Sequence, residues 1–185
     1  SRSGNPLFFR YGFLDGRAIV QPIQPTIDMA KMKTLEDLFE HELKDLYSAE
    51  KQFIEAMPKM MQAATDSRLK RVFEKHLEET KAQKQRLEQV LEMCGVSAGR
   101  KKCEAVAGLI EESQTLIDEK AGPEVKDAGL IAAAQRMEHY EISGYGTARH
   151  FAERLGKQDA AELLAQTLKE EQKADTLLND LAKSY

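Results

Sequence analysis

Five glutamates interrupt the apolar faces of helices that the sequence predicts. Glu50, Glu79, Glu141 and Glu171 each lie near the middle of a different predicted helix, and Glu138 precedes Glu141 by one turn. A carboxylate inside a helical bundle is destabilising unless it is paired, protonated or bound to a metal ion. Several carboxylates at one depth would repel one another, and a pair of metal ions is a common natural remedy. The pattern therefore predicts a metal site.

Four long helices must position these glutamates. Apolar residues recur every three or four positions in four segments, at about residues 34–64, 67–93, 124–155 and 157–183. Thr34 is a suitable N-cap for the first helix, and Pro58 predicts a kink near its end. Gly95 and Gly156 are stop signals for the second and third helices. Since the midpoints of equal-length bundle helices meet at one level, the central glutamates should converge.

The connection between the second and third helices predicts the topology. It covers about residues 94–123, whereas neighbouring helices of a bundle are usually joined by two to eight residues. The connection contains its own amphipathic segment, residues 104–120. We therefore expect an all-α, ferritin-like four-helix bundle with a long crossover that carries a short extra helix.

The first 32 residues differ from the remainder of the chain. They hold three of the five prolines and four aromatic residues, and they lack a helical period. We predict an N-terminal extension at residues 1–32 and a bundle domain at residues 33–185. The extension is either an arm that packs on a neighbouring subunit or a leader that precedes a natural start at Met29 or Met32.

Composition argues against several classes of partner. The 185 residues carry a formal charge of −4, with a pI near 5.7, which disfavours nucleic acid and anionic membranes. No apolar run approaches the ~18 residues expected of a membrane-spanning helix. Cys94 and Cys103 do not form a disulfide framework, and nothing resembles a secretory signal. These observations favour a cytoplasmic location.

The expected ligands are mainly carboxylate oxygens, which suit iron or manganese. Bundle sites of this kind usually include a Glu-x-x-His on each of two helices, but Ala82 and Ala174 occupy the expected histidine positions. Three nearby residues are weaker candidates: His76, Gln83 and Asp175. The alternative interpretation is that the glutamates lie at the edges of the apolar faces, with buried stems and solvated carboxylates.

Several stretches of the chain resemble a known bacterial family. The sequences MKTLEDLFEHELKDLYSAEKQ, HLEETKAQKQRLEQV, KCEAVAGLIEE, DAGLIAAAQRMEHYEISGYGT and TLKEEQKADTLL are similar to those of the YciE/YciF stress proteins. The resemblance covers about residues 32–183 and includes the crossover. It implies a ferritin-like four-helix fold that is commonly dimeric.

A more distant similarity to rubrerythrins concerns the ligands. Their first-helix glutamate corresponds to Glu50, and their third-helix Glu-x-x-Glu corresponds to Glu138 and Glu141. Their fourth-helix Glu-x-x-His corresponds to Glu171 and Ala174, so the histidine is absent here. On the second helix, either Glu79 or Thr80 takes the glutamate position.

These patterns lead to two functional hypotheses. The first is a ferritin-like stress protein with two iron ions per chain, or manganese as the alternative, held by the five glutamates. If such a protein is catalytic, it would oxidise ferrous iron with peroxide or oxygen. The second is a metal-free helical bundle with a structural or interaction role under stress. The expected partners are metal ions and further copies of the chain, as a homodimer or higher oligomer.

Overall fold

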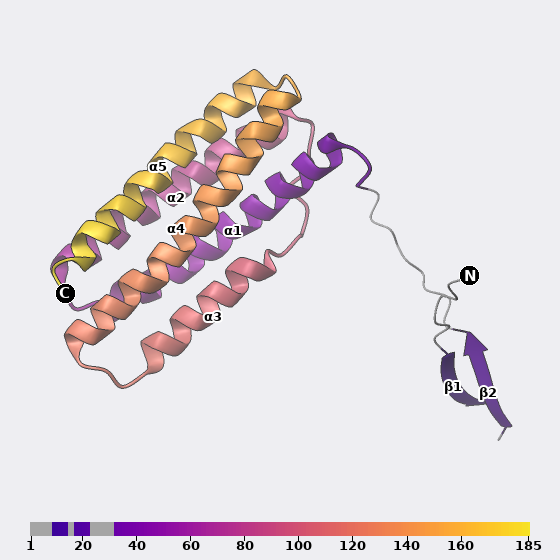
Figure 1. Ribbon diagram of the computed structural model, residues 1–185, viewed down its shortest axis with the longest axis horizontal. Helices are drawn as coiled ribbons and strands as arrows, with labels where there is room; N and C mark the ends of the chain where they lie inside the picture. The colour runs from indigo at the N-terminus through magenta and orange to yellow at the C-terminus, as the bar shows by residue number, and fades with distance from the viewer. Residues whose placement is uncertain (1–8, 15–16, 23–31) are drawn as a thin grey trace, which may run out of the picture. The chain divides into compact units, whose positions relative to one another are not determined.

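A computed structural model describes residues 9–14, 17–22 and 32–185, and it divides the chain into two units, residues 1–32 and 33–185. The described part of the first unit is an antiparallel hairpin of β1 (Phe9–Leu14) and β2 (Arg17–Pro22) (Figure 1). The missing helical period of this extension agrees with the hairpin, but it did not predict the strands. Asp15 and Gly16, between the strands in sequence, are a pair that favours tight hairpins.

The second unit begins with two antiparallel helices. Helix α1 (Leu35–Ala63) follows Thr34, whose side chain accepts a hydrogen bond from the Asp37 backbone N–H, while the Asp37 carboxylate accepts one from the Thr34 N–H. This reciprocal arrangement is a capping box. The helix continues through Pro58 to its end. Helix α2 (Ser67–Met93) begins after Asp66, whose side chain caps its first turn.

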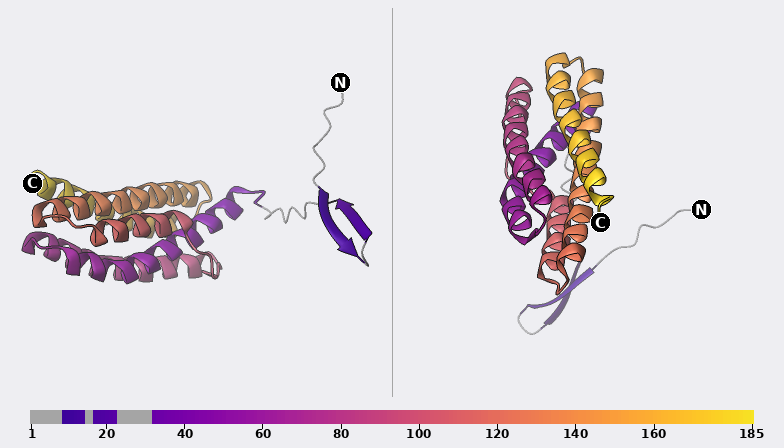
Figure 2. Two further views of the ribbon diagram at one scale, coloured as in Figure 1. Left: turned by 90° about the horizontal axis from the view of Figure 1, so that it is seen from below. Right: turned by 90° about the vertical axis from the view of Figure 1, so that its left-hand side faces the viewer.

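Three further helices complete the bundle. Helix α3 (Glu104–Asp118) lies in the crossover and packs on α1 and α4 (Pro123–Arg154), while α5 (Gln158–Ala182) packs on α4 and α2 (Figures 1 and 2). The crossover returns the chain along the bundle, so α4 begins at the end where α1 turns into α2 (Figure 1). The predicted all-α, ferritin-like bundle with its long crossover and short extra helix is confirmed. Among the described residues, no helix combines the length and apolar character needed to cross a membrane.

The core consists of two apolar clusters with a polar layer between them. One cluster includes Phe53, Phe73 and Leu130, and the other includes Leu46, Leu87 and Leu164. Apart from Asp127 in the first turns of α4, the buried polar residues of the four long helices lie between these two sets in sequence, and they are Ser48, Glu50, His76, Thr80, Gln83, Glu138, Glu141, Thr167 and Glu171. Apolar burial on both sides provides the stabilisation that holds this polar layer in place.

Two local features fix the helices around that layer. The carboxylate of Asp127, in the first turns of α4, accepts hydrogen bonds from the backbone N–H groups of Thr65 and Asp66, at 2.7 and 2.8 Å. This contact ties the α1–α2 turn to α4. Gly144 allows α4 to approach α1 closely, because a Cβ there would lie 2.7 Å from Leu46 Cδ2.

Candidate metal centre

Each of the four long helices contributes an ionisable side chain to the polar layer. Glu50 comes from α1, His76 from α2, Glu138 and Glu141 from α4, and Glu171 from α5. None is more than 7% exposed. Four of the five glutamates predicted to converge, Glu50, Glu138, Glu141 and Glu171, are thus buried in the interior, whereas Glu79, the fifth, is not among the buried residues.

Four of these residues bring one potential ligand atom each into a compact group. The atoms of His76, Glu138, Glu141 and Glu171 all lie within 4.8 Å of one another. His76 Nε2 is 3.1 Å from Glu138 Oε1 and 3.9 Å from Glu171 Oε2. An imidazole with several carboxylates is a donor set suited to iron or manganese.

Glu50 is held against the same layer by a tyrosine on α4. The Tyr145 hydroxyl donates a hydrogen bond to Glu50 Oε1, and both side chains are essentially inaccessible to solvent. Tyr145 is four residues after Glu141, on the same face of α4. The close approach of α1 and α4 at Gly144 brings this hydroxyl within reach of Glu50.

Many polar atoms of the centre have no hydrogen-bond partner in the part of the chain that the structure describes. They are Glu50 Oε2, His76 Nδ1, Gln83 Oε1, Glu138 Oε2, Glu141 Oε1 and both carboxylate oxygens of Glu171. Buried polar atoms are nearly always satisfied in folded proteins, and a cluster of exceptions indicates a bound water or ion. Because most of these atoms are carboxylate oxygens, the residues present fit a metal ion.

Burial and mutual repulsion change the protonation of the centre. Burial raises the pKa of Glu50 to about 8, and it raises the pKa of Glu141 and Glu171 well above 4.5. The neighbouring glutamates add to the shift at Glu141. Burial alone would lower the pKa of His76, but the charge of Glu138 and its hydrogen bond raise that pKa well above 6.5. In the absence of a metal, protonation of the buried glutamates therefore reduces the negative charge of the centre.

Glu79 is placed differently from the other predicted ligands. Its carboxylate pairs with Lys75 on the outer side of α2, its side chain is 28% exposed, and its Oε2 is 3.9 Å from His76 Nδ1. The nearby His76 imidazole, together with the Lys75 ammonium, lowers the pKa of Glu79 to about 2. Glu79 thus lies outside the compact group of four, and His76 is the residue of α2 that points into it.

The weaker candidates also separate into near and distant residues. Gln83 is fully buried, and its Nε2 donates to Glu170 Oε2 at 3.2 Å. Asp175 is partly exposed and lies 3.2 Å from His139 Nε2, away from the compact group. His76 is therefore the weaker candidate that the structure brings into the compact group.

Thr167, which is buried near the centre, was not named as a site residue from the sequence, and Thr80 was named only as the alternative to Glu79 on the second helix. The Thr80 hydroxyl donates to the His76 carbonyl at 2.8 Å, and Thr167 accepts a hydrogen bond from Arg86 at 2.6 Å. Arg86 also donates a bidentate pair of hydrogen bonds to the Glu170 carboxylate. The sequence signal was the continuation of the apolar stripe through positions 73, 76, 80 and 83, which places Thr80 inside and Glu79 at the edge.

A four-helix bundle with a traversing crossover and a buried carboxylate–histidine centre defines a ferritin-like protein. Comparison with known families gives the more specific assignment. Residues 34–185 match the model described as Domain of unknown function (DUF892), and the chain belongs to that family.

Individual relatives agree with this assignment. Protein YciF of Escherichia coli is 49% identical over 152 residues, which cover 82% of this chain and 92% of that protein. The crystal structure of this E. coli stress protein matches with a TM-score of 0.80 over 82% of this chain and 96% of that chain. YcfI of Rhodopseudomonas palustris, described as a candidate structural protein, has a TM-score of 0.78 at 43% identity, covering 80% and 95% of the two chains.

Proposed function

We propose that this chain is a ferritin-like stress protein whose buried centre binds two metal ions, most favourably iron. The observation that carries the proposal is a group of carboxylate oxygens, contributed by three helices of the bundle, that lack a partner within the described ranges 9–14, 17–22 and 32–185. Leaving so many acceptors unsatisfied in the interior is costly, and cations would satisfy them together. The similarity to E. coli YciF, described as a stress protein, supports the physiological context.

The residues present suggest how the two ions would be held. His76, Glu138, Glu141 and Glu171 form the compact group that suits one ion. Glu50 supplies a further carboxylate from α1, which would allow a second ion to be shared with the α4 and α5 glutamates. Gln83 Oε1 is an additional buried acceptor without a partner. When bound, iron would supply the redox chemistry for oxidation of the ferrous state by peroxide or oxygen.

The chain's own groups would control protons and access. Tyr145 holds Glu50 Oε1 through its hydroxyl and so fixes the orientation of that carboxyl group. Glu50, Glu141 and Glu171 must each release a proton to bind a cation, because their pKa values are raised. The apolar clusters on either side of the layer restrict water.

Elemental analysis tests the proposal directly. The metal-free chain is incubated anaerobically with ferrous iron, desalted, and analysed for metal per chain. About two ions per chain are expected, and a Glu141→Gln/Glu171→Gln double variant should retain far less. An exposed-site control, Glu74→Gln, should bind as much iron as the unmodified chain. Near-zero iron in the unmodified chain would rule out the metal-binding function.

A second candidate is a metal-free bundle with a structural role under stress. The observation that favours it is the His76–Glu138 ion pair, which neutralises charge inside the centre without a cation. The absence of the Glu-x-x-His pattern at Glu171 and Ala174 points the same way. This candidate predicts a folded, fully helical protein that excludes metal in the experiment above.

A further inference from the structure

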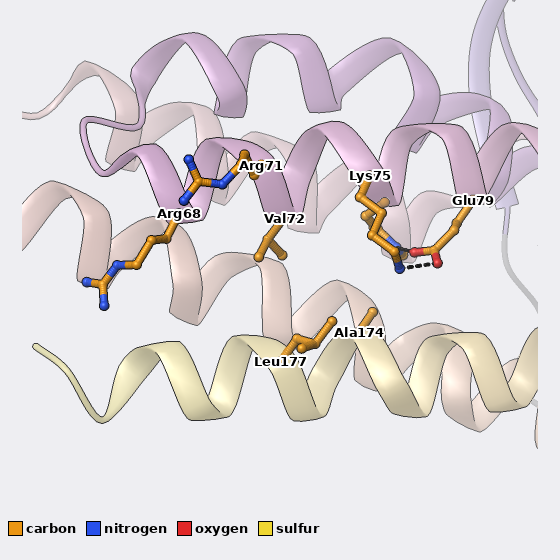
Figure 3. Close-up of a pocket in the computed structure, with 8 residues that line it drawn as sticks. Arg68, Arg71, Val72, Lys75, Glu79, Ala174 and Leu177 are labelled. Carbon is orange, nitrogen blue, oxygen red and sulfur yellow. Dashed lines mark hydrogen bonds and ion pairs between the residues drawn. The ribbon is translucent and has the colours of Figure 1, made fainter.

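A cavity of about 230 Å³ opens between α2 and α5, beside the buried centre. Its lining residues are Arg68, Arg71, Val72, Lys75, His76, Glu79, Ala174 and Leu177. Pockets for drug-sized ligands span about 300–1,000 Å³, so this cavity suits a smaller molecule. Figure 3 shows the basic side chains of Arg68, Arg71 and Lys75 on the α2 side of the cavity. Leu177 and Ala174 lie on the α5 side.

The charges around the cavity favour an anionic group at one end. Arg68 is engaged by Asp66 through its guanidinium, and Lys75 is engaged by Glu79. Arg71 is exposed and has no ion-pair partner within residues 9–14, 17–22 and 32–185. A guanidinium offers paired donors that match a carboxylate. Arg71 is therefore the available anion-binding group of the cavity.

The rest of the cavity has a different character. Val72, Leu177 and Ala174 provide apolar walls from both helices. His76, which is only 7% exposed, lies beyond them and also lines the cavity. Its Nε2 faces Glu138, whereas its Nδ1 lies 3.9 Å from Glu79 and has no hydrogen-bond partner among the described residues. A buried, unpartnered imidazole nitrogen at a cavity is a contact point for a polar group of a ligand.

We propose that this cavity binds a short-chain carboxylate that carries a second polar group at its far end. Arg71 binds the carboxylate, Val72 and Leu177 contact the apolar body, and His76 Nδ1 contacts the distal group. His76 follows Arg71 by five positions on α2, an axial rise of about 7.5 Å along the helix, which a short chain spans. The site places a small organic acid directly beside the carboxylate centre. It requires no metal for binding, so it stands apart from the proposed iron chemistry.

The test uses the metal-free full-length chain and 6-hydroxyhexanoate as the probe. Binding is followed by NMR through the methyl groups of Val72 and Leu177. The expected result is saturable shifts, with binding about tenfold weaker in Arg71→Gln, because a charge-assisted contact is lost. Arg154→Gln, an exposed arginine in the last turn of α4, is the matched control and should bind as the unmodified chain does.

Comparison ligands test the two ends of the site. Hexanoate, which lacks the distal hydroxyl, should bind about fivefold more weakly because one neutral hydrogen bond is lost. 1-Hexanol should show little binding because it lacks the carboxylate. The proposal is overturned if the probe gives no saturable shifts, or if Arg71→Gln and Arg154→Gln bind it equally. Equal affinity for the two acids would overturn the role of His76 and hence the proposed ligand class.

Discussion

The Tyr145 hydroxyl donates its hydrogen bond to Glu50, and this pair links α4 to α1 inside the polar layer. Tyr145 lowers the pKa of Glu50, although burial outweighs this contribution and leaves the value near 8. The Tyr145 side chain is also a member of the apolar cluster that includes Leu46 and Leu164. Tyr145 therefore connects the packing of the bundle to the proton affinity of a proposed ligand.

Replacing Tyr145 should destabilise the protein while leaving the carboxylates in place. Tyr145→Phe removes the donor to a buried carboxyl oxygen, which costs about 1–3 kcal/mol of unfolding free energy. Urea denaturation of the metal-free chain at neutral pH measures the effect. Tyr47→Phe is the control, because the Tyr47 hydroxyl bonds Glu88 at an exposed position, and it should change stability by less than about 0.5 kcal/mol. Equal effects of the two variants would contradict the structural role of the pair.

Neutral substitutes for the buried glutamates should stabilise the metal-free protein. Burial and neighbouring carboxylates raise the pKa values of Glu141 and Glu171, so keeping either group charged near neutral pH opposes folding. Glu141→Gln or Glu171→Gln should raise the melting temperature by about 2 °C or more while abolishing tight metal binding. Differential scanning calorimetry, with Glu74→Gln as the exposed control, checks this prediction. Unchanged melting in both variants would indicate solvated carboxylates.

The stability of the metal-free chain should fall as the pH rises above the acidic range. The pKa of Glu50 rises on folding from 4.5 to about 8, so its contribution is fully present below pH 4.5 and declines up to about pH 8. The raised pKa of His76 acts in the same direction, with stabilisation present below pH 6.5 and lost as pH rises through the folded value. Urea denaturation between about pH 5 and about pH 9 should show this decline in the free energy of unfolding. The Glu50→Gln variant should show a smaller decline. A pH-independent result would refute the protonation assigned to the centre.

Metal affinity should have the opposite pH dependence. Because binding requires the deprotonated forms of Glu50, Glu141 and Glu171, affinity should increase as the pH rises toward about 8. Manganese titration at several pH values, with detection of released protons, measures this linkage. Metal binding without proton release would mean that the buried carboxylates are already ionised.

The N-terminal unit should be dispensable for the bundle. Residues 33–185 form a separate unit, so deletion of residues 1–28 should leave helicity and metal content unchanged and weaken only association between chains. Circular dichroism and sedimentation measure these two properties. A truncated chain that does not fold would show that the unit is part of the domain, and an unchanged oligomer would show that it has no role in assembly.

Particular residues show how far the sequence could determine the site. The periodicity and cap at Thr34 were sufficient to predict α1, and the second helix begins and ends at the predicted residues, Ser67 and Met93. The choice between His76 and Glu79 was harder, because both lie in the polar part of the α2 stripe. The structure resolves it through packing, since Lys75 draws Glu79 outward while Glu138 pairs with His76. Periodicity does not contain information about such side-chain partners.

The division of the centre between distant parts of the chain has a consequence for folding. The α1–α2 and α4–α5 pairs are local hairpins, whereas the proposed ligands from α1 and α5 meet only after the crossover has brought the two hairpins together. Contacts of large sequence separation form late because of the entropy of closing a long loop. The centre should therefore assemble after both helical hairpins have formed. A cation would stabilise the docking of the two hairpins, because each hairpin carries only part of the proposed ligand set.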